Sequence, residues 1–128
     1  VVKALEENGA VVVAYENCGG TKSVDRLIDE SAEDIYEAIA ERYLQIGCSG
    51  MTPNKNRYEL LGRLIEEYKV DGVVEMTLQA CHTYNVEAKS IEKFVKGKGV
   101  PYIHVETDYS QEDIGQLNTR MTAFVEML

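Results

Sequence analysis

The fold of this chain is decided by residues 73–85, which read VVEMTLQACHTYN. An apolar run typical of a buried strand ends near Thr77, a short loop carries Cys81, and a helical pattern begins near Asn85. A strand that leads into a helix is half of a βαβ unit. In an open α/β sheet, ligands usually bind at the loops that follow the strands. Cys81 is therefore the first candidate for a functional residue.

The same alternation continues along the other parts of the 128 residues. A helix tail over residues 1–8 ends at Gly9, and a capping-box-like sequence opens a helix at Ser31. We predict strands over residues 10–15, 72–77 and 101–106, and helices over residues 31–45, 56–68, 86–96 and 114–128. Alternating strands and helices form parallel sheets with right-handed crossovers. The predicted fold is a single α/β domain over residues 1–128, three-layered and flavodoxin-like (Rossmann-like), with a parallel sheet and flanking helices.

Three cysteines fall in loops that this topology brings to the carboxyl edge of the sheet. Cys18 follows the first predicted strand, Cys81 follows the second, and Cys48 precedes the helix that returns to the second strand. A thiolate at a helix N-terminus, as at Cys81, is stabilised by the helix dipole and by free amide groups. Glycines beside the other two cysteines allow the backbone to approach a bulky group closely. By position alone, each thiol is compatible with metal binding, redox chemistry, or a half-buried loop position without a function.

Four other loop residues are predicted to line a pocket at this edge, namely Glu16, Asn17, Gly19 and His82. A strand-end carboxylate such as Glu16 can transfer a proton if its pKa is raised, or it can accept hydrogen bonds from loop amides. His82 can be a metal ligand or a proton donor, or it can be an ordinary exposed residue. The residues alone leave these alternatives open.

Composition argues against several classes of protein. A net charge of −9 disfavours non-specific nucleic-acid binding. No apolar stretch approaches the roughly 20 residues that span a membrane, and the first residues lack the apolar core of a secretory signal. Three cysteines without a CxxC pair favour a reducing, cytoplasmic setting. Because the chain starts without Met and within a helical pattern, we expect a domain of a longer polypeptide.

Standard catalytic motifs do not occur in the sequence. The absent patterns are GxGxxG, GxxxxGKS/T, GxSxG and HExxH, which disfavours common dinucleotide sites, P-loop hydrolysis, the α/β-hydrolase elbow and zincin proteolysis. An FMN site remains an alternative. Its phosphate loop would have to be residues 18–23, which read CGGTKS.

Several segments together resemble one family. They are KVDGVV at residues 69–74, CHTY at 81–84, GVPYI at 99–103, ETDYS at 106–110, GQLNTRMTAFVE at 115–126, and MTPN at 51–54 with Arg57. This set resembles component D of the 2-hydroxyacyl-CoA dehydratases, a family that includes subunits of benzoyl-CoA reductase. The likeness spans most of the chain and is most specific from Tyr68 onward. It implies that the chain is the C-terminal part of a larger subunit with two flavodoxin-like halves.

The resemblance also implies a mechanism. Each active subunit of the family holds a [4Fe-4S] cluster through cysteines, and a separate ATP-dependent activator protein supplies one electron. The electron reaches the thioester carbonyl of an acyl-CoA, and the resulting ketyl radical expels a hydroxyl group. Carried over, Cys81 is a cluster ligand, Cys18 is a second candidate that either binds the cluster or lines the pocket, and Cys48 has the weakest support.

The resemblance further implies a second dehydratase subunit as a partner. The other cluster cysteines of the family lie in an N-terminal half that this chain lacks, so the isolated domain is expected to be inactive. Two alternatives remain beside dehydration. One is ring reduction of the benzoyl-CoA reductase type, and the other is a non-catalytic assembly or regulatory relative that holds no cluster. An FMN-binding domain is the weakest alternative.

Overall fold

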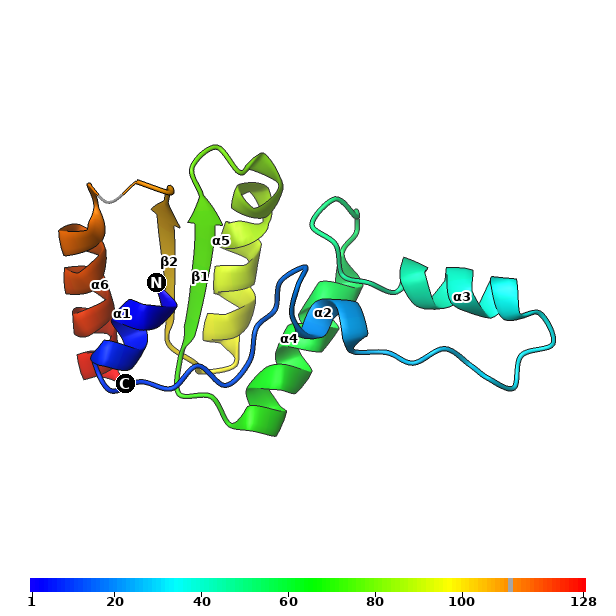
Figure 1. Cartoon of the computed structure of the whole chain (residues 1–128). Helices are drawn as coiled ribbons and strands as arrows, with labels where there is room; N and C mark the ends of the chain where they lie inside the picture. Colours follow the sequence, from blue (N-terminus) through cyan, green and yellow to red (C-terminus); the bar gives the residue numbers. More distant parts are fainter. Residues whose placement is uncertain (111) are drawn as a thin grey trace. The chain divides into compact units, whose positions relative to one another are not determined.

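The computed structural model describes residues 1–110 and 112–128 (Figure 1). The chain divides into two compact units, one formed by Val1–Val13 with Lys69–Leu128 and the other by Ala14–Tyr68. No helix among the described residues is long and apolar enough to cross a membrane.

The first unit is built on two parallel strands. β1 (Val73–Leu78) pairs with β2 (Tyr102–Thr107), from Val73 opposite Tyr102 to Leu78 opposite Thr107. The connection between the strands is α5 (His82–Gly97), and the chain continues after β2 into α6 (Ile114–Met127). A short N-terminal helix, α1 (Val2–Glu7), packs against α6. The unit is therefore a βαβ crossover with helices added to it, as the alternating pattern predicts.

The two faces of this sheet differ in character. On one face, Val105 packs with Leu5 of α1 and Met121 of α6, and Val105 and Met121 are fully buried. On the other face, which α5 covers, β1 and β2 present polar side chains such as Thr77 and His104. This follows from the period of two in a strand, which sends successive side chains to opposite faces. One side of the sheet thus carries the apolar core, and the other carries a polar network.

The predicted strand over residues 10–15 is wrong, because these residues form no strand in the structure. Ala10 and Val12 pack against the core cluster, whereas Val11 is 77% and Val13 is 48% exposed. The side chains alternate as in a strand, but a strand also needs a neighbour for its backbone groups. The described sheet therefore has two strands, and the larger flavodoxin-like sheet stays a prediction.

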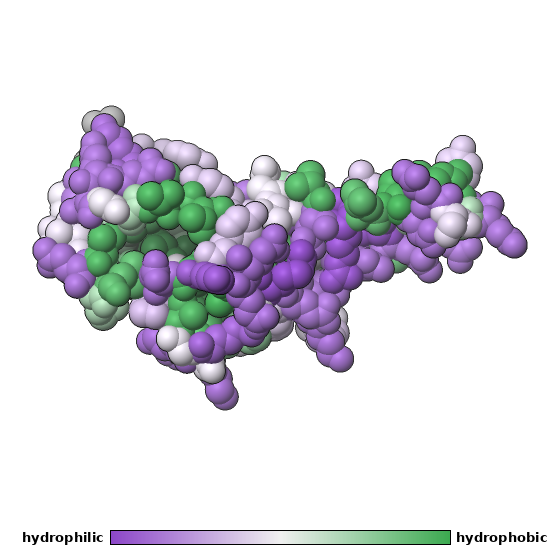
Figure 2. All heavy atoms as spheres, turned by 90° about the horizontal axis from the view of Figure 1, so that it is seen from below, coloured by the Kyte–Doolittle hydropathy of each residue, from purple (hydrophilic) through white to green (hydrophobic). Residues whose placement is uncertain are grey.

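The second unit contains only helices among its described regular elements. These are α2 (Thr21–Val24), α3 (Ile35–Leu44) and α4 (Lys55–Tyr68). α3 begins later than the capping-box-like sequence at Ser31 predicts, because the Asp34 side chain accepts hydrogen bonds from Tyr36 N at 2.8 Å and Glu37 N at 3.3 Å. Figure 2 shows apolar side chains on the surface of the segment that carries α3, in agreement with the exposure of residues at both ends of this helix.

Candidate functional site

Cys81 occupies the turn between β1 and α5. Its amide donates a hydrogen bond to Leu78 O at 2.9 Å, and Asn85 N donates to Cys81 O at 3.1 Å, so the cysteine closes β1 and begins the helix. The preceding residue, Ala80, has a φ of 63°, in the left-handed region that non-glycine residues seldom adopt. The turn therefore holds the thiol at one defined position, the N-cap of α5.

The surroundings of Cys81 favour its thiolate form. The backbone N–H of Tyr84 donates to the sulfur and lowers the pKa of the Cys81 thiol, and the Thr83 hydroxyl, 3.6 Å from Sγ, lowers it further. These amide and hydroxyl groups belong to the first turn of α5, where N–H groups have no partner inside the helix. A half-exposed thiolate of this kind suits metal binding or nucleophilic chemistry.

Cys18 lies at the tip of a tight loop in the second unit. Gly20 N donates to Asn17 O at 3.1 Å, and Gly19 N donates to the Asn17 side chain at 3.1 Å. A Cβ on Gly20 would lie 2.3 Å from Tyr15 O, so only glycine fits at this position. These hydrogen bonds and the close approach of Gly20 to Tyr15 define a tight turn. The Cys18 side chain in this turn is exposed.

Glu16 holds this loop in place through ion pairs with two cationic side chains. Its carboxylate lies 3.2 Å from Arg57 Nε and 3.9 Å from Lys22 Nζ. The side chains are 8%, 4% and 2% exposed for Glu16, Arg57 and Lys22, so the ion cluster is buried. Glu16 therefore connects the Cys18 loop to α2 and α4. A role for Glu16, Asn17, Gly19 or His82 in lining a substrate pocket stays a prediction.

Arg57 also supports the loop of Cys48. A Cβ on Gly47 would lie 2.7 Å from Arg57 N, so the backbone before Cys48 packs directly on the start of α4. Cys48 itself is exposed, in a turn where Met51 N donates to Cys48 O at 2.9 Å. The two cysteine loops of the second unit thus rest on the same residue. In the sequence, Arg57 stands out only as part of a family pattern, because its burial and its partner 41 positions away are not visible there.

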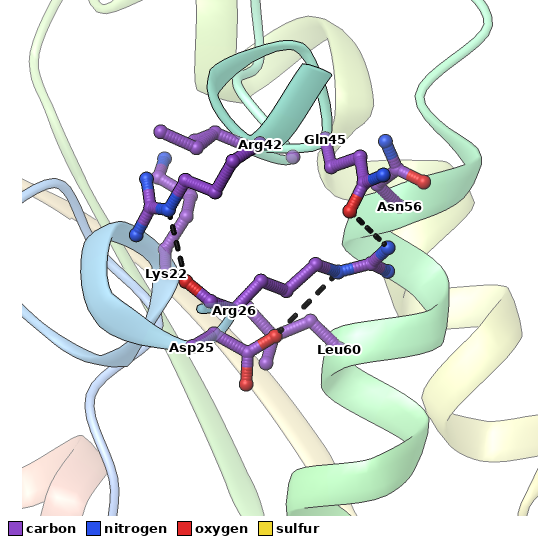
Figure 3. A pocket seen from close by; sticks show the side chains of 9 residues that line it. Lys22, Asp25, Arg26, Arg42, Gln45, Asn56 and Leu60 are labelled. Carbon is purple, nitrogen blue, oxygen red and sulfur yellow. Dashed lines mark hydrogen bonds and ion pairs between the residues drawn. The ribbon is translucent and has the colours of Figure 1, made fainter. Parts of the chain in front are cut away.

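A small polar cavity lies between α2, α3 and α4 (Figure 3). Its volume is about 10 Å³, room for one water molecule at most. Arg26 crosses it and donates to Gln45 Oε1 at 3.0 Å, while Arg42 Nε donates to Arg26 O at 2.9 Å. These bonds join the end of α3 to the segment that follows α2, and Arg26 Nη2 also donates to Glu59 of α4 at 3.2 Å. The cavity is too small for a substrate.

The three thiols are divided between the two units of the chain. Cys81 lies in the first unit, and Cys18 and Cys48 lie in the second. Among residues 1–110 and 112–128, no three His, Cys, Asp or Glu side chains come together in a group able to hold a metal ion. A convergence of the three cysteines on one edge stays a prediction.

Comparisons with known proteins agree with the resemblance seen in the sequence. The model of the family described as 2-hydroxyglutaryl-CoA dehydratase, D-component, matches residues 1–128. The chain is 53% identical over 129 residues to YjiM of Escherichia coli K12, named as a candidate dehydratase subunit, and covers 33% of that protein. It is 20% identical over 133 residues to the beta subunit of (R)-2-hydroxyglutaryl-CoA dehydratase of Acidaminococcus fermentans, covering 35% of it. All of this chain is aligned in both cases.

A further relative is the B subunit of benzoyl-CoA reductase of Thauera aromatica, 28% identical over 109 residues. That match uses 83% of this chain and 24% of the relative. The chain therefore spans about a third of the length of these relatives, or less.

Proposed function

Since the chain belongs to the 2-hydroxyglutaryl-CoA dehydratase D-component family, we propose that it is part of a dehydratase subunit that acts on acyl-CoA thioesters. The observation that carries this proposal is the position of Cys81 within a match that extends over residues 1–128. A thiol with a lowered pKa stands at the N-terminus of α5, where the backbone favours a thiolate.

The donor chemistry of the chain fits an iron–sulfur cluster. Such clusters are held by cysteine thiolates, and a [4Fe-4S] cluster would supply one electron at a time to the thioester. Cys81 would provide one ligand, and Cys18 is the second candidate, either as a ligand or as a residue that lines the site. The complete ligand set would include groups from other parts of the subunit, so the 128-residue chain by itself is expected to be inactive.

The remaining side chains would hold the thiols in position. The buried contact between Glu16 and Arg57 fixes the Cys18 loop on α4, and the packing of Gly47 on Arg57 fixes the Cys48 loop beside it. In the first unit, the turn at Ala80 and the first turn of α5 fix Cys81. Ligands that are fixed in this way need little rearrangement when a cluster binds.

Three partners follow from the proposal: a second dehydratase subunit, an ATP-dependent activator protein that supplies the electron, and the acyl-CoA substrate. Two relatives are named as subunits of larger enzymes, the dehydratase and the reductase, which supports assembly with other chains. A reducing cytoplasm is the proposed location, since three cysteines without a CxxC pair favour such a setting.

The proposal is tested in the complete subunit that contains this chain. The subunit is reconstituted anaerobically with iron and sulfide, and the iron content and visible absorbance of the wild type, Cys81→Ser and Cys48→Ser are compared. We expect Cys81→Ser to lose most of the cluster absorbance and Cys48→Ser to keep it, with Cys18→Ser as a third variant. Undiminished absorbance in Cys81→Ser would exclude this cysteine as a ligand.

Ring reduction is the second candidate function, favoured by the similarity to the benzoyl-CoA reductase of Thauera aromatica. The two functions are separated by supplying the reduced complex with a 2-hydroxyacyl-CoA or with benzoyl-CoA and following which thioester is consumed. A wild-type protein that takes up no iron under reconstitution would instead identify a non-catalytic assembly or regulatory relative.

A further inference from the structure

An open groove runs between α5 and β2 in the first unit. Its volume is about 420 Å³, within the range of about 300–1,000 Å³ typical of small-molecule sites. The residues that line it are Asn85, Ala88, Lys89, Glu92, Tyr102, His104 and Glu106. The α5 members recur at helical spacing and the β2 members alternate, so each element presents one continuous face to this α5–β2 groove.

The hydrogen bonds at the upper end of the groove have a defined direction. A carboxylate only accepts hydrogen bonds, so Asn85 must turn its amide NH₂ toward Glu106, and Nδ2 lies 3.1 Å from Oε2. The amide oxygen of Asn85 then faces Thr77, whose hydroxyl donates to it at 2.9 Å. Thr77 is 2% exposed, so its hydroxyl is shielded from competing water.

This direction assigns the tautomer of His104. The hydroxyl of Thr77 has one proton, and Asn85 receives it. The Nε2 atom of His104, 2.8 Å from the same hydroxyl oxygen, must therefore be the donor in that contact. A neutral His104 carries its proton on Nε2 and keeps a lone pair on Nδ1.

The groove is consequently rich in acceptors. The Tyr102 hydroxyl donates to the buried carboxylate of Glu75, and Lys89 Nζ donates to Glu92 at 2.7 Å. By contrast, within residues 1–110 and 112–128, His104 Nδ1 and the second oxygen of Glu106 have no protein donor. The Lys89 ammonium is held by Glu92 and keeps further N–H groups, whereas at the end of the groove near Asn85 an imidazole nitrogen and a carboxylate oxygen remain for a ligand.

We propose that the α5–β2 groove binds a small organic cation that carries N–H donors, of the class of a guanidinium or primary ammonium group. Such a cation would donate to His104 Nδ1 and to the Glu106 carboxylate, and charge-assisted hydrogen bonds of this type are the stronger ones. The site uses neither a thiol nor a metal, so it is independent of the proposed cluster.

The test uses the two histidines of the chain. The chain is labelled with ¹⁵N-histidine, and the imidazole resonances are followed during titration with methylguanidinium. Tetramethylammonium, a cation without N–H groups, serves as the control probe. We expect methylguanidinium to shift the Nδ1 resonance of His104 saturably and to leave His82 unchanged, and we expect tetramethylammonium to shift neither.

Variants localise the binding. Glu106→Gln removes the charge and is expected to weaken methylguanidinium binding about tenfold. Glu126→Gln, an exposed carboxylate on α6, is expected to bind like the wild type. Absence of a saturable His104 shift in the wild type, equal shifts by both cations, equal shifts of both histidines, or an Nδ1 that is protonated at neutral pH in the unliganded chain would each overturn the proposal.

Discussion

Replacement of Arg57 by methionine is expected to destabilise the unit formed by Ala14–Tyr68 by roughly 3 kcal/mol. Arg57 Nε lies 3.2 Å from Glu16 Oε2, and the two side chains are 4% and 8% exposed. Without the guanidinium, Lys22 Nζ remains 3.9 Å from Glu16 Oε1, which is beyond hydrogen-bond distance. Removing Arg57 takes away the shorter of these two contacts, so the desolvation of the buried Glu16 carboxylate is offset less well, and the magnitude follows from that penalty.

Urea unfolding followed by circular dichroism measures the free energy of unfolding. Glu59→Met is the matched control, because Glu59 also lies on α4 and pairs with Arg26 at 3.2 Å, but the two side chains are 64% and 36% exposed. An exposed pair contributes at most about 1 kcal/mol. A local readout is hydrogen exchange at Thr21 N, which donates to Tyr15 O at 2.9 Å and should exchange faster when the loop loses its anchor.

The double variant Glu16→Gln with Arg57→Met tests whether the remaining charge matters. It also removes the carboxylate that lies 3.9 Å from the buried Lys22 ammonium, so we expect it to be no more stable than Arg57→Met alone. The reasoning is refuted if Arg57→Met lowers the free energy of unfolding no more than Glu59→Met does.

Three further outcomes are expected. Because the pKa of Cys81 is lowered, its thiolate is present at lower pH than that of an ordinary cysteine, and iodoacetamide should label it before the other two thiols in a pH series read by mass spectrometry. Gly20→Ala should lower the urea midpoint, since its Cβ would lie 2.3 Å from Tyr15 O, whereas Gly97→Ala meets nothing within 4 Å and should not. Hydrogen bonds from two lysines lower the pKa of Glu92 to about 2. The contribution of Glu92 to stability is therefore present above its usual pKa of 4.5 and is lost as the pH falls toward 2. An NMR titration of the Glu92 carboxyl carbon measures this pKa.

Most elements were predictable because their signals are local. β1 and β2 lie within one residue of the predicted strands at residues 72–77 and 101–106, and α4 and α6 match their predicted helices as closely. α5 starts at His82 rather than Val86, because the turn at Cys81 leads directly into the helix and no separate loop follows it. The strand predicted over residues 10–15 is wrong, because an alternating pattern of apolar residues indicates which side chains can be buried and not whether a neighbouring strand exists.

The candidate site was predictable in part. The placement of Cys81 before a helix follows from a strand, a turn and a helix that are contiguous in the sequence. The burial of Glu16 was not predictable, because its partner Arg57 is 41 positions away. A strand-end glutamate looks the same in the sequence whether it faces solvent or a buried guanidinium.

The sequence by itself determined the family, the order of the elements from α3 to α6, and the thiol at the start of α5, since motifs, periodicity and turns are properties of neighbouring residues. Only the tertiary structure decided that Thr77, Asn85 and His104 form one directed chain of hydrogen bonds, and that a single arginine supports two cysteine loops. Those contacts join residues 8 to 41 positions apart. Donor and acceptor atoms at such separations meet only after the elements have packed, and burial then makes each partner necessary.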